Sequence, residues 1–178
     1  MASNQSSTTS ESRKAAARKA AATRAKDAIA ILKADHRKVE GLFARYEEAK
    51  EKNDRKQAIF QQIAMELKVH MQLEEEIFYP QSRAFVEEDD TVNEAIVEHQ
   101  AAKDLIAQLE AMAPSDEMYD AKVQVLQEQI EHHVEEEEEE YFPEAKKNGM
   151  DTKAVGEEIM AKKPELMAQM KAGGRAIQ

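Results

Sequence analysis

The sequence predicts an all-α protein, an antiparallel up-down-up-down four-helix bundle, and three observations support this prediction. Glycine and proline are scarce, at five and four of 178 residues, so few positions favour turns. Alanine, methionine, glutamate and lysine, which all favour helices, are abundant. Apolar residues recur every three or four positions along four long segments, and short polar stretches separate these segments. Helices joined by short connections pack as antiparallel neighbours.

Each expected helix has one inward seam, whose residues lie alternately three and four positions apart. The first helix spans residues 27–50, with the seam Ile29, Leu32, His36, Val39, Phe43 and Tyr46. The second follows residues 53–54, which can cap it, and has the seam Phe60, Ile63, Leu67, His70, Glu74 and Ile77. The third follows residues 89–91, with the seam Val92, Ala95, His99, Ala102, Ile106 and Leu109. The fourth follows a turn at 114–116, with the seam Tyr119, Val123, Leu126, Ile130, His133 and Glu137.

Composition divides the chain into three parts. Residues 1–26 form a polar and then basic arm with a net charge of +5, predicted to be disordered or a frayed helix. Residues 27–148 form the bundle, which ends at Asn148 and Gly149. Residues 149–178 form short C-terminal helices, broken near Pro164, and a tail.

Charge and composition exclude several classes of function. The net charge of −11 argues against nucleic acid as a partner, with the basic stretch 13–26 as the one exception. A protein partner is compatible with this charge. Without cysteine there is no disulfide, thiolate metal site or iron–sulfur cluster. No apolar run is long enough to cross a membrane, and residues 1–12 lack the apolar centre of a secretory signal. We therefore expect a cytoplasmic protein that makes no membrane contact.

An internal repeat is the most informative feature of the sequence. Shifting the chain by 63 residues places His36 on His99, His70 on His133 and Glu74 on Glu137. The same shift matches Phe60 with Val123, Leu67 with Ile130, Phe78 with Tyr141 and Pro80 with Pro143. The molecule is therefore expected to consist of two helical hairpins related by a pseudo-twofold axis. Each hairpin contributes one single histidine and one His-x-x-x-Glu pair.

This spacing predicts a two-metal site. Residues four apart share one helix face, with about 5–6 Å between their Cβ atoms, so each His-x-x-x-Glu pair can bind one centre. The predicted ligands are His36, His70, Glu74, His99, His133 and Glu137. Four imidazoles and two carboxylates are too many for one tetrahedral ion, but two ions can share them, with two histidines each and both carboxylates bridging. Coordination positions would then remain open for water, O2, peroxide or NO.

The alternative is that these histidines are ordinary core residues. Four of the five histidines fall on the seams in two equivalent pairs, which a purely structural role explains poorly. The fifth, His132, is expected to be exposed, and Glu40 to lie at the surface or behind the ligands. Of the acidic runs 74–76 and 135–140, only Glu74 and Glu137 lie on the seams, so the remainder is expected to be a solvated face. A ferritin-like Glu-x-x-His site is absent from the sequence, because no histidine has a glutamate three residues before it.

The sequence over roughly residues 27–145 resembles the hemerythrin-like (HHE cation-binding) family. The resemblance depends on four motifs in combination: Asp35-His36, the stretch from His70 through Glu74 to Pro80, Glu98-His99, and the stretch from His133 through Glu137 to Pro143. It implies that the four histidines bind two iron ions and that Glu74 and Glu137 are bridging carboxylates. The O2-carrying hemerythrins have a further histidine at the position of Lys103, and an Asp five residues after the last histidine where this chain has Glu137 at four. Compared with the O2-carrying hemerythrins, these two differences imply a more open and more symmetric metal site, which argues against reversible O2 transport.

Three functions are compatible with this reading. The favoured one is a non-haem di-iron protein that binds or senses O2, NO or iron. The second is an enzyme that decomposes peroxide, in the manner of a catalase. The third is a structural bundle with adventitious metal. Imidazole and carboxylate ligands also suit manganese or zinc, so the metal itself is not fixed by the sequence.

Overall fold

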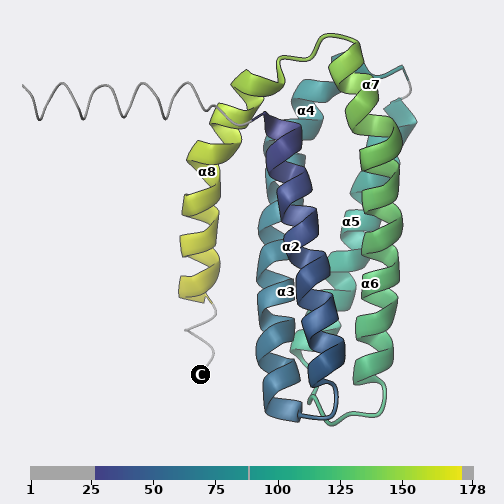
Figure 1. Ribbon diagram of the computed structural model, residues 1–178, viewed down its shortest axis with the longest axis vertical. Helices are drawn as coiled ribbons and strands as arrows, with labels where there is room; N and C mark the ends of the chain where they lie inside the picture. The colour runs from purple at the N-terminus through teal and green to yellow at the C-terminus, as the bar shows by residue number, and fades with distance from the viewer. Residues whose placement is uncertain (1–26, 88, 174–178) are drawn as a thin grey trace, which may run out of the picture.

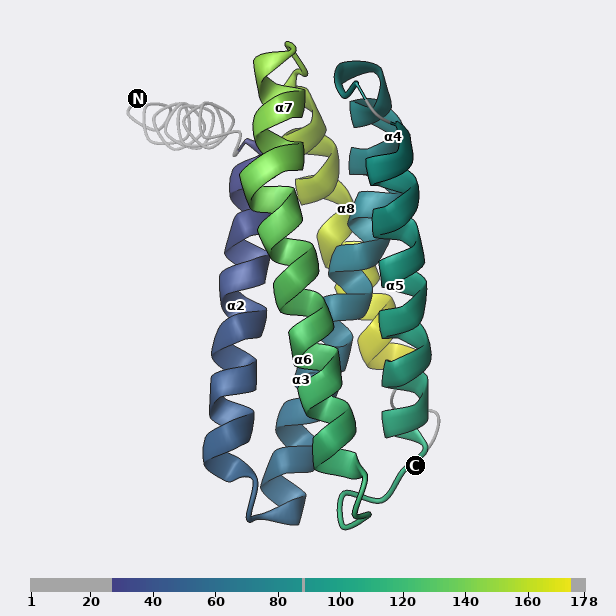
Figure 2. The same ribbon diagram turned by 90° about the vertical axis from the view of Figure 1, so that its right-hand side faces the viewer.

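The computed structural model describes residues 27–87 and 89–173, and the arm predicted over residues 1–26 lies outside them. Four long helices stand side by side, joined at alternate ends (Figures 1 and 2). They are α2 (Ala28–Ala49), α3 (Asn53–Leu73), α5 (Asp89–Glu110) and α6 (Tyr119–Glu136). The part of the chain that the structure describes contains no β-strand. The predicted antiparallel bundle is therefore confirmed.

The predicted seams face the interior. Every seam residue is buried except Ile77, which is half-buried. The apolar interior consists of two clusters, one built around Phe43, Phe60 and Leu126 and the other around Leu32, Phe78 and Phe142. Between them lies a polar layer made of the histidines and glutamates from the middle of each seam. Burying such groups is costly unless a partner satisfies them, so this layer needs a chemical explanation.

Two wide helical turns interrupt the bundle at equivalent positions of the repeat. The π-turns η1 (Glu74–Phe78) and η3 (Glu137–Tyr141) lead into α4 (Tyr79–Ser82) and α7 (Phe142–Lys147). Each begins at a predicted metal ligand and is followed by a proline, Pro80 or Pro143, whose ring clashes with the carbonyl four residues earlier in a regular α-helix. The wider turn relieves that clash and adds a residue to the turn. The seam therefore shifts from Ile77 to Phe78 and Tyr79, which are fully buried.

Connecting segments complete the two hairpins. A 3-10 turn, η2 (Arg83–Phe85), leads from α4 toward α5. The second hairpin ends with α7, which stops at Asn148 and Gly149. Gly149 has a φ of 97°. This left-handed conformation suits glycine, and it is the helix stop that the sequence predicted.

A fifth helix, α8 (Thr152–Gly173), packs against α2 and α3 on the outside of the bundle (Figure 1). The expected break near Pro164 is wrong, because α8 continues through this residue as one helix. Its buried face, with Val155, Ile159 and Leu166, rests on the bundle, and this packing offsets the hydrogen bond that Pro164 cannot donate. Among the described residues, no helix is long and apolar enough to cross a membrane. The cytoplasmic location stays a prediction.

Candidate metal centre

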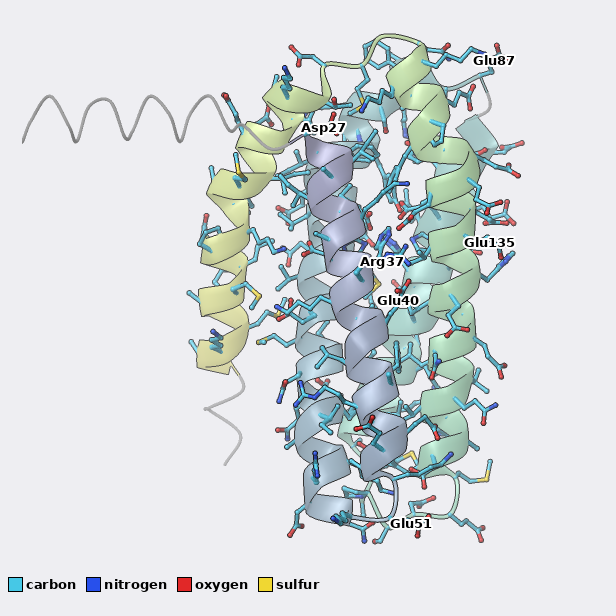
Figure 3. The ribbon with its side chains drawn as sticks, in the orientation of Figure 1. Asp27, Arg37, Glu40, Glu51, Glu87 and Glu135 are labelled. Carbon is cyan, nitrogen blue, oxygen red and sulfur yellow. The ribbon has the colours of Figure 1, made fainter. Side chains whose placement is uncertain are left out.

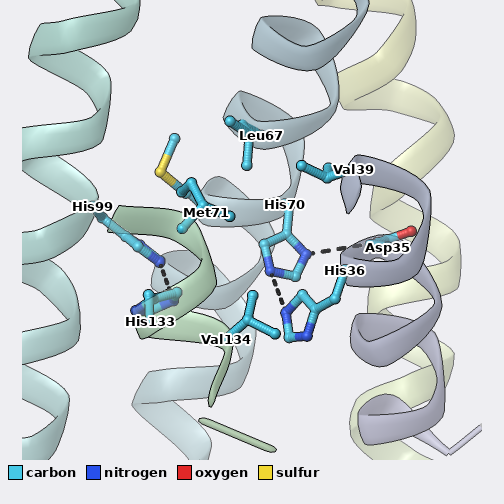
Figure 4. A pocket seen from close by; sticks show the side chains of 10 residues that line it. Asp35, His36, Val39, Leu67, His70, Met71, His99, His133 and Val134 are labelled. Carbon is cyan, nitrogen blue, oxygen red and sulfur yellow. Dashed lines mark hydrogen bonds and ion pairs between the residues drawn. The ribbon is translucent and has the colours of Figure 1, made fainter. Parts of the chain in front are cut away.

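The six predicted ligands meet in the polar layer at the middle of the bundle. The Nε2 atoms of His36 and His70 are 3.0 Å apart, and those of His99 and His133 are also 3.0 Å apart (Figure 4). All four histidines are at least 96% buried. The first pair joins α2 to α3 and the second joins α5 to α6, so each hairpin supplies one pair, as the repeat predicted.

The two carboxylates lie between the histidine pairs. Glu74 presents Oε1 to His70 Nε2 at 3.1 Å and Oε2 to His99 Nε2 at 3.5 Å. Glu137 presents Oε2 to His36 Nε2 at 3.4 Å and to His133 Nε2 at 3.6 Å. Among the described residues, neither Oε1 nor Oε2 of Glu74, nor Oε2 of Glu137, has a hydrogen-bond partner. Buried carboxylate oxygens without hydrogen bonds, facing imidazole nitrogens, form a donor set that fits metal ions.

The far nitrogen of each histidine faces a further carboxylate. Nδ1 of His36 lies 2.8 Å from Glu138, Nδ1 of His99 lies 2.9 Å from Glu75, and Nδ1 of His133 lies 2.8 Å from Glu98. Nδ1 of His70 lies 3.8 Å from Asp35, an ion-pair contact that is too long for a hydrogen bond. A carboxylate at this nitrogen fixes which ring nitrogen faces the centre and makes that nitrogen a better ligand.

Sequence reasoning missed these four outer carboxylates. Glu75 and Glu138 were assigned to the solvated face, but the π-turns bring them against histidines of the opposite hairpin. The signal that could have found them is the repeat itself. Asp35 and Glu98 are 63 residues apart, as are Glu75 and Glu138, so the outer carboxylates follow the same symmetry as the ligands.

Lysine or arginine side chains bind three of the outer carboxylates. Unlike the carboxylates, these basic residues do not recur at the offset of 63 residues. Asp35 accepts a hydrogen bond from Lys163 of α8, Glu75 binds Lys103 at 2.5 Å, and Glu138 binds Arg37 at 2.5 Å. Lys103 therefore points away from the centre toward Glu75. Glu98 instead has His132 as a neighbour, 3.9 Å away.

Two other residues lie where the sequence placed them. The side chain of His132 is 62% exposed, and Glu40 pairs at the surface with Arg37 at 2.6 Å (Figure 3).

The charges of the centre compensate one another strongly. Burial disfavours a charged His70, yet the charge of Glu74 and the nearby carboxylate of Asp35 raise its pKa to about 10. Burial acts in the same direction on His133, and Glu137 and Glu98 outweigh it, raising the pKa of His133 to about 9. Burial alone would raise the pKa of Glu137, but the facing histidines lower it to about 2. The metal-free centre therefore holds protons where cations would bind, and binding must release them.

Tyr79 also reaches the centre, and it was not among the predicted site residues. Its side chain is 99% buried, and its hydroxyl donates a hydrogen bond of 2.8 Å to Glu137 Oε1. Burial and the charges of Glu137 and Glu74 raise the pKa of Tyr79 well above its usual value, so the hydroxyl keeps its proton and acts as a donor. The signal was weak, because the repeat places Phe142 at the equivalent position.

A small cavity of about 10 Å³ adjoins the centre. Both histidine pairs and Asp35 form its polar wall (Figure 4), and apolar side chains form the rest: Val39, Leu67, Met71, Ile130 and Val134. A space of this size holds about one water-sized molecule.

Comparison with known proteins agrees with the geometry. Residues 27–145 match the family described as the hemerythrin HHE cation-binding domain. A protein from Nostoc sp. (strain PCC 7120), described as a DNA nickase, is 33% identical over 150 residues, which are 82% of this chain but only 41% of that protein. The crystal structure of a hemerythrin HHE cation-binding domain-containing protein from Mycobacterium kansasii superposes with a TM-score of 0.70 at 23% identity, covering 80% of this chain and 88% of that one, and shows the same fold. The chain therefore belongs to the hemerythrin HHE cation-binding family.

Proposed function

We propose that this chain is a non-haem di-iron protein that binds or senses O2 or NO at a two-metal centre formed by His36, His70, Glu74, His99, His133 and Glu137. The observation that supports it best is the set of three buried carboxylate oxygens that have no hydrogen-bond partner among the described residues and face four buried imidazoles. Two cations would satisfy all of these groups at once. Iron is the metal that the family suggests, and manganese or zinc would suit the same ligands.

The chain's own residues would hold and shield the ions. The outer carboxylates orient the four rings, and the apolar clusters above and below exclude water. When bound, the two ions would supply open coordination places and one-electron chemistry. The neighbouring cavity of about 10 Å³ has room for about one water-sized molecule, which supports a very small ligand such as O2, NO or peroxide over a larger substrate.

Peroxide decomposition is the second candidate, and the position of Lys103 favours it. In the O2-carrying relatives a histidine at this place helps to fill the coordination of one ion. Here the Lys103 ammonium binds Glu75 at 2.5 Å and directs its charge away from the centre. An additional open place would favour redox turnover of a small substrate over simple storage.

We do not propose DNA as a partner, although a relative is described as a DNA nickase. This chain spans about two fifths of that protein. Residues 27–178 carry a net charge of −16, which opposes contact with a phosphate backbone. The basic residues 13–26, the one stretch that would favour such contact, lie outside the described residues.

The decisive experiment measures metal content and chemistry together. Protein produced with ample iron should contain two irons per chain and absorb in the near ultraviolet through ligand-to-iron charge transfer. Release of O2 from added peroxide, followed with an oxygen electrode, then separates the second candidate from the first. One iron or none per chain would refute the di-iron proposal, and an inert, fully loaded protein would refute the peroxide candidate.

A further inference from the structure

One hydroxyl breaks the symmetry of the centre. The inner histidines and the outer carboxylates all repeat at an offset of 63 residues, but Tyr79 is matched by Phe142. Phe142 is fully buried and stacks on His36, with ring centroids 6.0 Å apart. Tyr79 lies beside His99 instead, with its hydroxyl 3.4 Å from Nε2. A hydroxyl is therefore present beside one histidine pair, and a phenyl ring takes its place beside the other.

This hydroxyl leaves the two carboxylates with different capacities. Both oxygens of Glu74 are without a hydrogen-bond partner among the described residues, and each faces a different histidine pair. In Glu137, only Oε2 lacks a hydrogen-bond partner among the described residues, because Oε1 accepts the hydrogen bond of Tyr79. Glu74 can thus bridge two ions through two oxygens. Glu137 offers only Oε2 free of a hydrogen bond among the described residues, so the two carboxylates differ in the oxygens that they can present to metal.

The possible ligand groups divide accordingly. One group contains His36, His70, Glu74 and Glu137, with ligand atoms all within 4.8 Å of one another. The other contains Glu74, His99 and His133 and lacks Glu137. The first group therefore offers four candidate ligands and the second offers three, and Glu137 Oε2 lies slightly closer to His36 Nε2, at 3.4 Å, than to His133 Nε2, at 3.6 Å.

We propose that Tyr79 makes the two metal positions unequal by engaging Glu137 Oε1, so that Glu137 presents only Oε2 to metal and completes the position at His36 and His70. The position at His36 and His70 then binds metal more tightly. The position at His99 and His133 would then have fewer protein ligands and more room for a small ligand, beside the Tyr79 hydroxyl whose single proton is donated to Glu137 Oε1. Tyr79 acts through Glu137 as a positioning residue. This inference rests on the proposed two-metal function.

The test is an anaerobic titration of metal-free protein with ferrous iron, with Tyr79→Phe as the variant and Tyr141→Phe as its control. Tyr141 is a buried neighbour whose hydroxyl binds Ser82 rather than a ligand. Wild type and Tyr141→Phe should bind two irons in separate steps. In Tyr79→Phe the ratio of the two dissociation constants should fall by roughly tenfold or more, the effect typical of an altered contact to a metal ligand.

Mössbauer spectra of the protein loaded with ⁵⁷Fe give a readout that a loss of stability would not imitate. Wild type should show two ferrous sites of equal area, and Tyr79→Phe should show two sites that approach one another. The double variant Tyr79→Phe with Phe142→Tyr moves the hydroxyl to the other half and should restore two distinct sites. Two irons bound identically in wild type, or unchanged spectra in Tyr79→Phe, would overturn this inference alone. Binding of a single iron would instead refute the two-metal function on which it rests.

Discussion

The two hairpins of the bundle present the same ligands but have different surroundings. In the α2–α3 half, the carboxylate behind His70 is Asp35, which lies beneath α8 and is bound by Lys163. In the α5–α6 half, the carboxylate behind His133 is Glu98, whose neighbour His132 is 62% exposed. The repeat thus specifies the ligands. Residues outside the repeat determine how far the outer carboxylates are covered and which positive charges neutralise them. A fifth helix covers one half of the centre, and the outer carboxylates of the other half are more exposed to solvent.

The largest effect should come from removing Glu74, the carboxylate that presents a separate oxygen to each half. Glu74→Gln takes away the carboxylate that faces His70 and His99, so both positions should lose metal. The stabilisation by metal, about 2.7 kcal/mol for a site at one hundred times its dissociation constant, should disappear with it. Metal content and melting temperature with and without metal measure this. The exposed neighbour Glu76 offers the control, and Glu76→Gln should bind metal and melt like wild type.

Alkaline pH should weaken the metal-free protein in both halves. The pKa values of His70 and His133 are raised to about 10 and about 9, above the ordinary value of 6.5. Stabilisation from their charged forms is therefore complete below pH 6.5 and lost as pH rises through 9 and 10. Urea unfolding of chelator-treated protein between pH 6 and 10 should show this decline. His133→Gln should remove the part of it near pH 9 and leave the part near pH 10, and an identical profile for both proteins would contradict the assignment.

Removing the cover should affect only one half. Lys163→Met leaves Asp35 without its cation beneath α8, so the position at His36 and His70 should bind metal up to about tenfold more weakly. Faster hydrogen exchange in α8 should accompany this loss. Lys162→Met is the matched control, because the ion-pair contacts of Lys162 with described residues are 3.8 Å long and lie at the surface. His132→Ala tests the other half and should change affinity little. Equal losses in the variants of Lys163 and Lys162 would show that α8 does not support the centre.

The buried seams and their histidines were predictable from the sequence, because they recur at regular spacings along the chain. A spacing of three and four residues identified the buried seams, and the offset of 63 residues brought His36, His70, His99 and His133 together. The family match and the fold agree with this reading. The structure also assembles Glu74 and Glu137 with these histidines, although their role as ligands remains a proposal.

The parts that were missed depend on departures from a regular helix or from the repeat. An α-helical seam places Ile77 inside and Glu75 outside, but after the π-turn before Pro80 both are half-buried and Glu75 contacts His99. The continuous α8 depends on packing against the bundle, which helix propensity around Pro164 does not reveal. Tyr79 was overlooked because its repeat counterpart is an ordinary core residue. Local patterns locate ligands well, whereas tertiary contacts decide what surrounds them.

The smallest effect is expected at Lys103, where the two candidate functions diverge. Its ammonium binds Glu75 in a half-exposed ion pair, and such pairs contribute about 0–1 kcal/mol. Lys103→Met should therefore keep two irons and change any peroxide-dependent O2 release by less than about tenfold. Lys103→His loses the same ion pair but adds an imidazole one helical turn after His99, where it can fill an open coordination place. If that place serves peroxide, Lys103→His should release O2 more slowly than Lys103→Met. Equal rates in the two variants would show that this position has no access to the centre, and the peroxide candidate would lose the observation that favours it.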